Sequence, residues 1–199
     1  PAVEAALCEP LSCSAYAVNQ TGMGMEDTVV ISGLGAIGMG MLQFALLRNP
    51  KRVIGIDTND ALCEIAKKLG AAEVLNPMKE DVTKRIMELT DGVGCDIYME
   101  ATGNPASVET GMNCLRKQGM LFIYSVFKKK AEIDLNQISE FKELRVIGGH
   151  LSPGAFPYTI DCLEKGKINA KVMVTDNEID EAMSAKKPDR VSIKTVLVP

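Results

Sequence analysis

An uncharged stretch at positions 28–47, TVVISGLGAIGMGMLQFALL, constrains the fold more than any other part of the chain. Twenty apolar residues in a helix are about enough to cross a bilayer, so a membrane span is one interpretation. The composition favours another, because Thr28 to Ile31 are typical of strands, and each of the four central glycines costs a helix roughly 1 kcal/mol. The stretch therefore predicts a short strand, a glycine turn and a helix.

The predicted helix begins at Ala36 and runs to about Arg48. Ile37, Met41, Phe44 and Ala45 recur at helical spacing, which predicts one apolar face directed to the core.

The alternation of strand and helix continues along the chain. Further strands are predicted at 52–56, 72–76, the apolar run before Gly103, 120–127 and 144–149, and further helices at 60–71, 80–90, 105–117 and 158–166. Repeated strand–helix units with short connections predict an α/β fold, in which a six-stranded parallel sheet carries helices on both faces.

The two ends of the chain stand outside this count. A helix is expected over 2–20, and the tail predicts a short helix around 178–187 and a strand over 192–198. A six-stranded domain does not need these segments. We therefore expect three parts: a helical segment over 1–22, the sheet domain over 23–166, and a return segment over 167–199 that belongs, like the first, to a neighbouring domain.

Composition excludes several classes of function. The net charge of −4 provides no basic field for a polyanion, so nucleic-acid binding is not expected. The six cysteines lack the paired spacing of a zinc site or the density of a secreted scaffold, which indicates reduced thiols. His150 is the only histidine, so no multi-histidine site is complete in this chain. No signal peptide is recognisable, and we expect a cytoplasmic protein that does not bind membranes.

The glycine turn carries the clearest chemical signal. Gly33, Gly35 and Gly38 match G-x-G-x-x-G directly after a strand and at the start of a helix. The first glycine makes the tight turn, the second lets a pyrophosphate approach the backbone, and the third lets helix and strand pack closely. A pyrophosphate would lie at the helix N-terminus, beside Ala36 and Ile37.

Asp57 adds to this signal, because it follows Gly38 by nineteen residues and ends the second predicted strand. A carboxylate at this place accepts both hydroxyls of an adenosine ribose and repels a 2′-phosphate. The next cationic side chain is Lys67. The expected cofactor is therefore NAD rather than NADP.

Glycine-rich motifs also occur in methyltransferases and FAD enzymes. A methyltransferase usually carries an acid just before its glycines, whereas Ile31 and Ser32 stand here, and an FAD enzyme stays open on the motif alone. Tyr124 and Lys128 have the Y-x-x-x-K spacing of short-chain reductases, but in a strand they lie about 13 Å apart. We interpret that pair as coincidence.

Five segments together resemble the zinc-dependent medium-chain dehydrogenases, especially the sorbitol-type polyol branch. They are ISGLGAIGMG, VIGID, EATG, ELRVIGGH and the opening CEPLS. The resemblance covers nearly the whole chain and implies a doubly wound Rossmann domain that binds NAD. The catalytic Cys and His-Glu pair of that family have no counterpart here, so we expect no catalytic residue within this chain and no activity from it alone.

The resemblance also implies roles for single residues. Glu9 of CEPLS matches a glutamate that coordinates the catalytic zinc directly or through water, although a glutamate in a first helical turn also stabilises a helix by itself. A lone carboxylate cannot hold zinc, so the metal is expected only in the complete enzyme.

Further positions match the cofactor contacts of the family. Ala101 and Thr102 match the segment along the ribose, and the basic residue that reaches the pyrophosphate corresponds to Lys194. Backbone groups that orient the nicotinamide amide correspond to Val126, Gly149 and Leu151. Leu62 departs from the pattern, because many members have a basic residue there.

These observations lead to two functional hypotheses. The first is the coenzyme-binding portion of an oxidoreductase that transfers a hydride from a secondary alcohol or polyol to NAD with zinc assistance, in a homodimer or homotetramer. The alternative is a free-standing NAD(H)-binding module or redox sensor. The chain does not begin with methionine, and Glu9 would be idle in a sensor, so the first is preferred.

Overall fold

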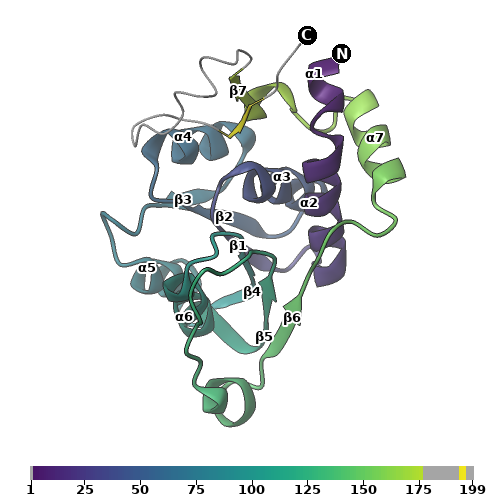
Figure 1. Cartoon of the computed structure of the whole chain (residues 1–199). Helices are drawn as coiled ribbons and strands as arrows, with labels where there is room; N and C mark the ends of the chain where they lie inside the picture. Colours follow the sequence, from purple (N-terminus) through teal and green to yellow (C-terminus); the bar gives the residue numbers. More distant parts are fainter. Residues whose placement is uncertain (1, 177–192, 196–199) are drawn as a thin grey trace.

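The computed structural model describes residues 2–176 and 193–195. Six strands form one parallel sheet in the order β3-β2-β1-β4-β5-β6 (Figure 1). They are β1 (Thr28–Ser32), β2 (Arg52–Ile56), β3 (Glu73–Leu75), β4 (Cys95–Glu100), β5 (Leu115–Ile123) and β6 (Arg145–Gly148). The predicted α/β class and the six-stranded parallel sheet are confirmed.

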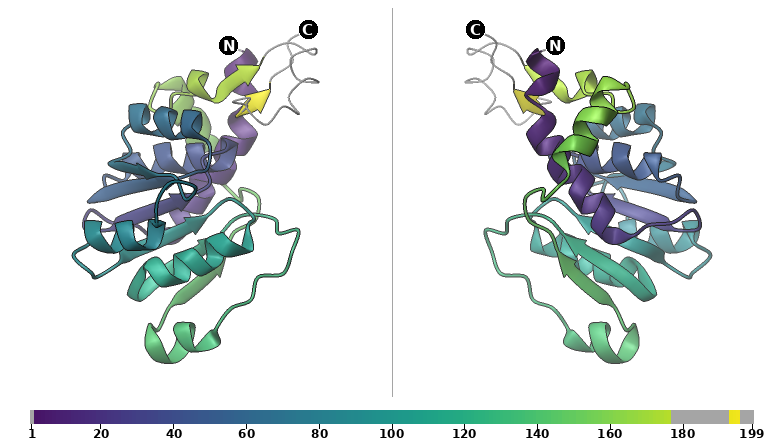
Figure 2. Two further views of the ribbon diagram at one scale, coloured as in Figure 1. Left: turned by 90° about the vertical axis from the view of Figure 1, so that its left-hand side faces the viewer. Right: turned by 90° about the vertical axis from the view of Figure 1, so that its right-hand side faces the viewer.

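Helices cover both faces of this sheet (Figures 1 and 2). One face carries α3 (Ala36–Leu47) and α4 (Asp60–Leu69), and the other carries α5 (Val82–Leu89) and α6 (Pro105–Cys114). Each face therefore has its own apolar core, which is why the central strand β1 is buried along its whole length.

The remaining elements extend the first of these faces. After α1 (Ala2–Ala5), α2 (Cys8–Thr21) packs against the outside of α3 and beside α7 (Phe156–Glu164). A π-helix (Gln137–Phe141) precedes β6, and a 3-10 helix (Lys171–Met173) leads into β7 (Val174–Asp176), which pairs with β8 (Lys194–Thr195).

The strand order decides where a ligand can bind. The chain moves outward from β1 to β3 and then returns to place β4 on the other side of β1. The helices that follow β1 and β4, α3 and α6, therefore lie on opposite faces of the sheet, and this arrangement leaves a crevice at the carboxyl edge.

Helix α3 is buried more completely than its sequence pattern predicted. Met41, Phe44 and Ala45 lie in the core as expected, but every residue from Gly38 to Ala45 is buried. The reason is α2, which covers the side of α3 that faces away from the sheet. A Cβ at Gly40 would lie 2.4 Å from Ser14 Oγ on α2, so the close contact of the two helices needs glycine there.

The junction of α6 and β5 differs from the prediction of a helix over 105–117 and a strand over 120–127. The helix ends at Cys114, and the strand occupies 115–123. The Lys142 ammonium donates hydrogen bonds to the carbonyls of Met112, Asn113 and Leu115, at 2.6, 2.9 and 2.8 Å, and so satisfies the helix end. The strand ends at Ile123, the last β5 residue paired with β4 and β6.

The tail of the chain was expected to contain a helix and a strand. The helix expected around 178–187 lies outside the described residues, whereas β8 falls within the strand expected over 192–198. In the described parts, no helix has the length and apolarity needed to cross a membrane. The division into parts at 22 and 166 stays a prediction.

Candidate functional site

The turn after β1 can be formed only by glycine at two of its positions. Gly33 has a φ of 94°, and a Cβ there would lie 2.9 Å from the carbonyl carbon of Ala101. A Cβ at Gly38 would lie 1.6 Å from the carbonyl oxygen of Gly33. The turn is therefore pressed against the loop after β4 on one side and against α3 on the other.

Gly35 lies in a different environment, because a Cβ there would meet no atom within 4 Å. This residue is exposed and forms the N-cap of α3, and no side chain caps the helix. The first N–H groups of a helix have no intrahelical partners, and the helix dipole gives them a partial positive charge. The start of α3, at Ala36 and Ile37, therefore opens onto accessible space that suits an anion.

Asp57 lies directly after β2 and is half-buried. Its Oδ2 accepts a hydrogen bond from Leu34 N–H at 2.7 Å, and its Oδ1 accepts one from Asn59 N–H at 2.9 Å. The first bond ties the carboxylate to the glycine turn. A carboxylate has about four lone-pair positions, so acceptor capacity for ligand hydroxyls is left on both oxygens.

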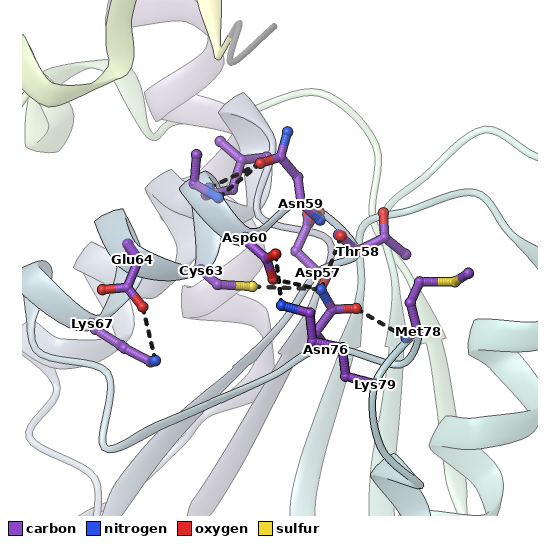
Figure 3. A network of polar contacts seen from close by, with 12 residues as sticks. Asp57, Thr58, Asn59, Asp60, Cys63, Glu64, Lys67, Asn76, Met78 and Lys79 are labelled. Atoms are coloured by element: carbon purple, nitrogen blue, oxygen red, sulfur yellow. Dashed lines mark hydrogen bonds and ion pairs between the residues drawn. The ribbon is translucent and has the colours of Figure 1, made fainter. Parts of the chain in front are cut away.

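The loop that carries Asp57 is held by a polar network at its back (Figure 3). Asn76, buried after β3, donates to Thr58 O at 3.0 Å and to Asp60 Oδ1 at 2.8 Å. The Lys79 ammonium pairs with Asp60 at 2.7 Å, and hydrogen bonds from Lys79 and Asn76 lower the pKa of the Asp60 carboxyl. These contacts hold the Thr58–Asp60 segment, directly after Asp57, from the β3 side.

Asp57 and the glycine turn border a common cleft of about 480 Å³. The cleft extends from the turn to α6 and has both apolar and hydroxyl-bearing walls. Its lining residues are Ser32, Gly33, Gly35, Ile56, Asp57, Thr58, Leu62, Pro77, Val82, Tyr98, Ala101, Thr102, Asn104, Ala106, Ser107 and Thr110.

Three hydroxyl groups form a chain at the cleft wall. Ser107 Oγ donates to Ser32 Oγ at 2.8 Å, and the Tyr98 hydroxyl lies 3.3 Å from Ser107 Oγ. Burial raises the pKa of Tyr98, so this group stays neutral. This wall can exchange hydrogen bonds with a polar ring but offers no charge.

The loop after β4 is anchored by Glu100, which is completely buried. Its carboxylate accepts hydrogen bonds from Thr102 N–H at 2.8 Å, from Gly103 N–H at 3.1 Å, and from the hydroxyls of Thr102 and Ser125. The loops after β4 and β5 are thus joined at one carboxylate, which positions Ala101 and Thr102 along the cleft.

The other predicted contacts at this sheet edge lie outside the cleft lining. Val126 is 92% exposed, and a Cβ at Gly103 would lie 2.5 Å from the carbonyl oxygen of Val126, so the β4 and β5 loops touch. Gly149 donates its N–H to Ile123 O at 2.9 Å, and Leu151 follows with an exposed side chain. These three residues lie beyond the carboxyl ends of β5 and β6.

Two further predicted residues, Glu9 and Lys194, come from other elements of the chain. Glu9 occupies the first turn of α2, where the Cys13 thiol donates to Glu9 Oε1 at 3.5 Å. Within the described residues, no group of three or more His, Cys, Asp or Glu side chains could hold a metal ion. Lys194 lies in β8, where its backbone pairs with Val174 of β7.

Several cleft residues were not foreseen from the sequence. Ser107 and Thr110 follow Asn104, the N-cap of α6, so the predicted helix start was a usable signal for them. Tyr98 lies in the apolar run that was predicted as a strand, and no local pattern marks it as a cleft residue. Its proximity to Ser32 and Ser107 depends on the pairing of β4 with β1, which the sequence does not show.

The fold and the cleft define a class of protein: a doubly wound α/β domain with a dinucleotide-type crevice at its switch point. Residues 36–165 match the family model of the zinc-binding dehydrogenases, which shows that the chain belongs to this family.

Named relatives agree with that assignment. An erythritol/L-threitol dehydrogenase of Mycolicibacterium smegmatis is 38% identical over the whole chain and 56% of its own length, and a sorbitol dehydrogenase of Halalkalibacterium halodurans is 30% identical over 98% of the chain and 58% of its own length. The chain thus spans about half the length of the curated relatives it matches.

Solved structures show the same relationship. A zinc-binding dehydrogenase from Sinorhizobium meliloti, solved with NADP, has a TM-score of 0.90 at 27% identity, over 98% of this chain and 59% of that one. The 2R,3R-butanediol dehydrogenase of Bacillus subtilis has a TM-score of 0.87 at 27% identity, over 98% of this chain and 57% of that one.

Proposed function

We propose that this chain binds NAD(H) as the coenzyme-binding portion of an oxidoreductase that transfers a hydride from a secondary alcohol or polyol to NAD with zinc assistance. One observation carries the proposal. The open N-terminus of α3 and the Asp57 carboxylate border the same cleft, and a hydrogen bond from Leu34 N–H to Asp57 links them.

Each part of the cleft suits one part of the dinucleotide. The pyrophosphate binds at Gly35 and the first turn of α3, where N–H groups and the helix dipole attract an anion. The adenosine ribose donates its hydroxyls to Asp57. The adenine ring enters between the apolar wall at Leu62 and Pro77 and the hydroxyl chain at Ser107.

The nicotinamide half continues toward the loops after β5 and β6. Backbone groups of Val126, Gly149 and Leu151 bind the carboxamide in this proposal. When bound, NAD supplies the ring that accepts the hydride. The chain's own contribution is to hold that ring in place.

NAD is preferred to NADP because of charge. Asp57 is held in position by two backbone bonds, so it cannot turn away from a 2′-phosphate. The cleft lining of the described chain contains no Lys or Arg, and the nearby Lys79 is paired with Asp60. The NADP-bound relative shows that a similar fold can hold the other cofactor, so the choice depends on these side chains.

The zinc part of the proposal concerns the complete enzyme. A catalytic zinc site needs about three protein ligands, whereas the described residues contain no group of three His, Cys, Asp or Glu side chains that could hold a metal ion, and the Cys13 thiol lies beside Glu9. We propose Glu9 as one ligand of the zinc in the complete enzyme. A small alcohol or polyol as substrate and a homodimer or homotetramer as assembly belong to the same proposal.

Replacement of Asp57 by alanine tests the cofactor site. Titration calorimetry of the wild-type chain should show binding of NAD and much weaker binding of NADP. In Asp57→Ala, NAD affinity should fall about tenfold or more, because charge-assisted bonds to the ribose are lost and Leu34 N–H loses its acceptor. NADP affinity should change less, since the repulsion disappears.

Glu132→Ala is the matched control, because it removes an exposed carboxylate that does not line the cleft. It should leave both affinities unchanged. Equal affinity of the wild type for NAD and NADP, unaltered by Asp57→Ala, would contradict the role of Asp57.

A further inference from the structure

Leu151 has an unusual backbone conformation for its residue type. Its φ is 53°, in the left-handed region, which is unfavourable for a residue other than glycine because its Cβ crowds the following carbonyl oxygen. Its side chain is 59% exposed, so burial of that side chain in a core does not hold the conformation. Another contact must hold it.

That contact is the Tyr124 hydroxyl, which donates a hydrogen bond to the carbonyl oxygen of Leu151. The two residues are 27 positions apart and lie on the segments that follow β5 and β6. The next residue, Ser152, accepts a hydrogen bond from Ser12 Oγ on α2 at 2.8 Å. Leu151 is thus held between the sheet edge and α2.

Tyr124 is itself well fixed. Its ring stacks on Phe122 with centroids 6.3 Å apart and an interplanar angle of 12°, and its N–H donates to Glu100 O at 3.0 Å. A Cβ at Gly149 would lie 2.6 Å from the Tyr124 ring. The hydroxyl therefore stands at one position beside the 149–151 segment.

We propose that Tyr124 is a positioning residue for the nicotinamide half of the coenzyme: its hydroxyl holds Leu151 in the left-handed conformation and so presents the 149–151 backbone in a form ready to bind the carboxamide. This assignment rests on the proposed function, because it takes Gly149 and Leu151 as the carboxamide contacts. Tyr124 needs no contact with the coenzyme.

The test separates the two halves of the coenzyme. NADH contains the nicotinamide, whereas ADP-ribose carries the adenosine and the pyrophosphate without it. In Tyr124→Phe the ring stays and the hydroxyl is lost. NADH affinity should fall about threefold to tenfold, as expected for one hydrogen bond, while ADP-ribose affinity should match that of the wild type. On the full chain, NADH fluorescence measures the NADH affinity and calorimetry measures the ADP-ribose affinity.

Two further variants sharpen the result. Tyr158→Phe removes a hydroxyl from a partly exposed ring on α7 and should change neither affinity. Adding Leu151→Gly to Tyr124→Phe should restore part of the NADH affinity, because glycine adopts a positive φ without the tether. The rescue would show that the backbone conformation of residue 151 carries the effect.

The possible results are distinct. Unchanged NADH binding in Tyr124→Phe, an equal loss for ADP-ribose, or a failed rescue by Leu151→Gly would each overturn the assignment. If the wild-type chain bound neither NADH nor ADP-ribose, the proposed function itself would fall. If the wild-type chain bound both ligands and Tyr124→Phe had no effect, only the positioning role of Tyr124 would be excluded.

Discussion

At the scale of single residues, two carboxylates near the cleft differ in burial. The difference distinguishes a structural residue from a residue that can bind a ligand. Asp57 is half-buried and keeps acceptor capacity for a ligand. Glu100 is completely buried, and four protein donor groups occupy its oxygens. A carboxylate enclosed in this way stabilises loops and is not open to ligand hydroxyls.

Glu100 should therefore be sensitive to replacement by an apolar residue. Glu100→Leu removes the acceptor of two partly buried backbone N–H groups and of two hydroxyl groups, and we expect the free energy of unfolding to fall by about 3–5 kcal/mol. Glu100→Gln keeps one oxygen and should cost about 1–2 kcal/mol. Urea denaturation measures both, and equal losses for the two variants would contradict this account.

At the scale of elements, Lys142 shows how a distant side chain can end a helix. The carbonyls at the end of α6 point to an ammonium that follows the π-helix, 27 to 30 residues away. Because cations are favoured at helix C-termini, this contact supports the end of α6 and the start of β5 together.

Lys142→Met should lower the free energy of unfolding by about 1–3 kcal/mol, because three carbonyls lose a charged donor while the aliphatic stem is kept. Lys51→Met removes an exposed ammonium and serves as the matched control, with an expected change within about 0.5 kcal/mol. Equal denaturation midpoints for the two variants would show that the capping contact contributes nothing.

At the scale of the whole molecule, the sheet separates two apolar cores, and thiols are buried in both. Burial raises the pKa of Cys13, Cys63 and Cys95, and it raises that of Cys114 to about 11 from an ordinary value of 9.0. The folded chain therefore keeps these thiols protonated at a pH where the unfolded chain ionises them.

Stability should consequently fall in alkali. A group whose pKa is higher in the folded state contributes stability that is complete below its unfolded pKa, here about 9, and is lost as pH rises through the folded pKa. For Cys114 the free energy of unfolding should decline by about 1.4 kcal/mol per pH unit between pH 9 and 11. Urea denaturation across this range should show a shallower decline in Cys114→Ala, and parallel declines would contradict the assignment.

Much of the fold could be predicted because it depends on neighbours in the sequence. The strand, turn and helix at 28–47 follow from the β-forming residues, the glycines and the helical spacing within one short stretch. The spacing of Asp57 after Gly38 likewise predicted a carboxylate next to the turn, and the structure places it there. The binding roles of these residues stay proposals.

The tertiary structure alone decided which distant residues meet. The burial of α3 from Gly38 to Ala45, the cap on α6, the hydroxyl chain at Ser107 and the bond from Tyr124 to Leu151 all join segments from different elements. Local patterns contain no information on such pairs, because a side chain's partner depends on the order of strands in the sheet and on the helices that pack over them. Spacing along the chain determined the elements and the turn, whereas packing between elements determined how the loops around the crevice are held.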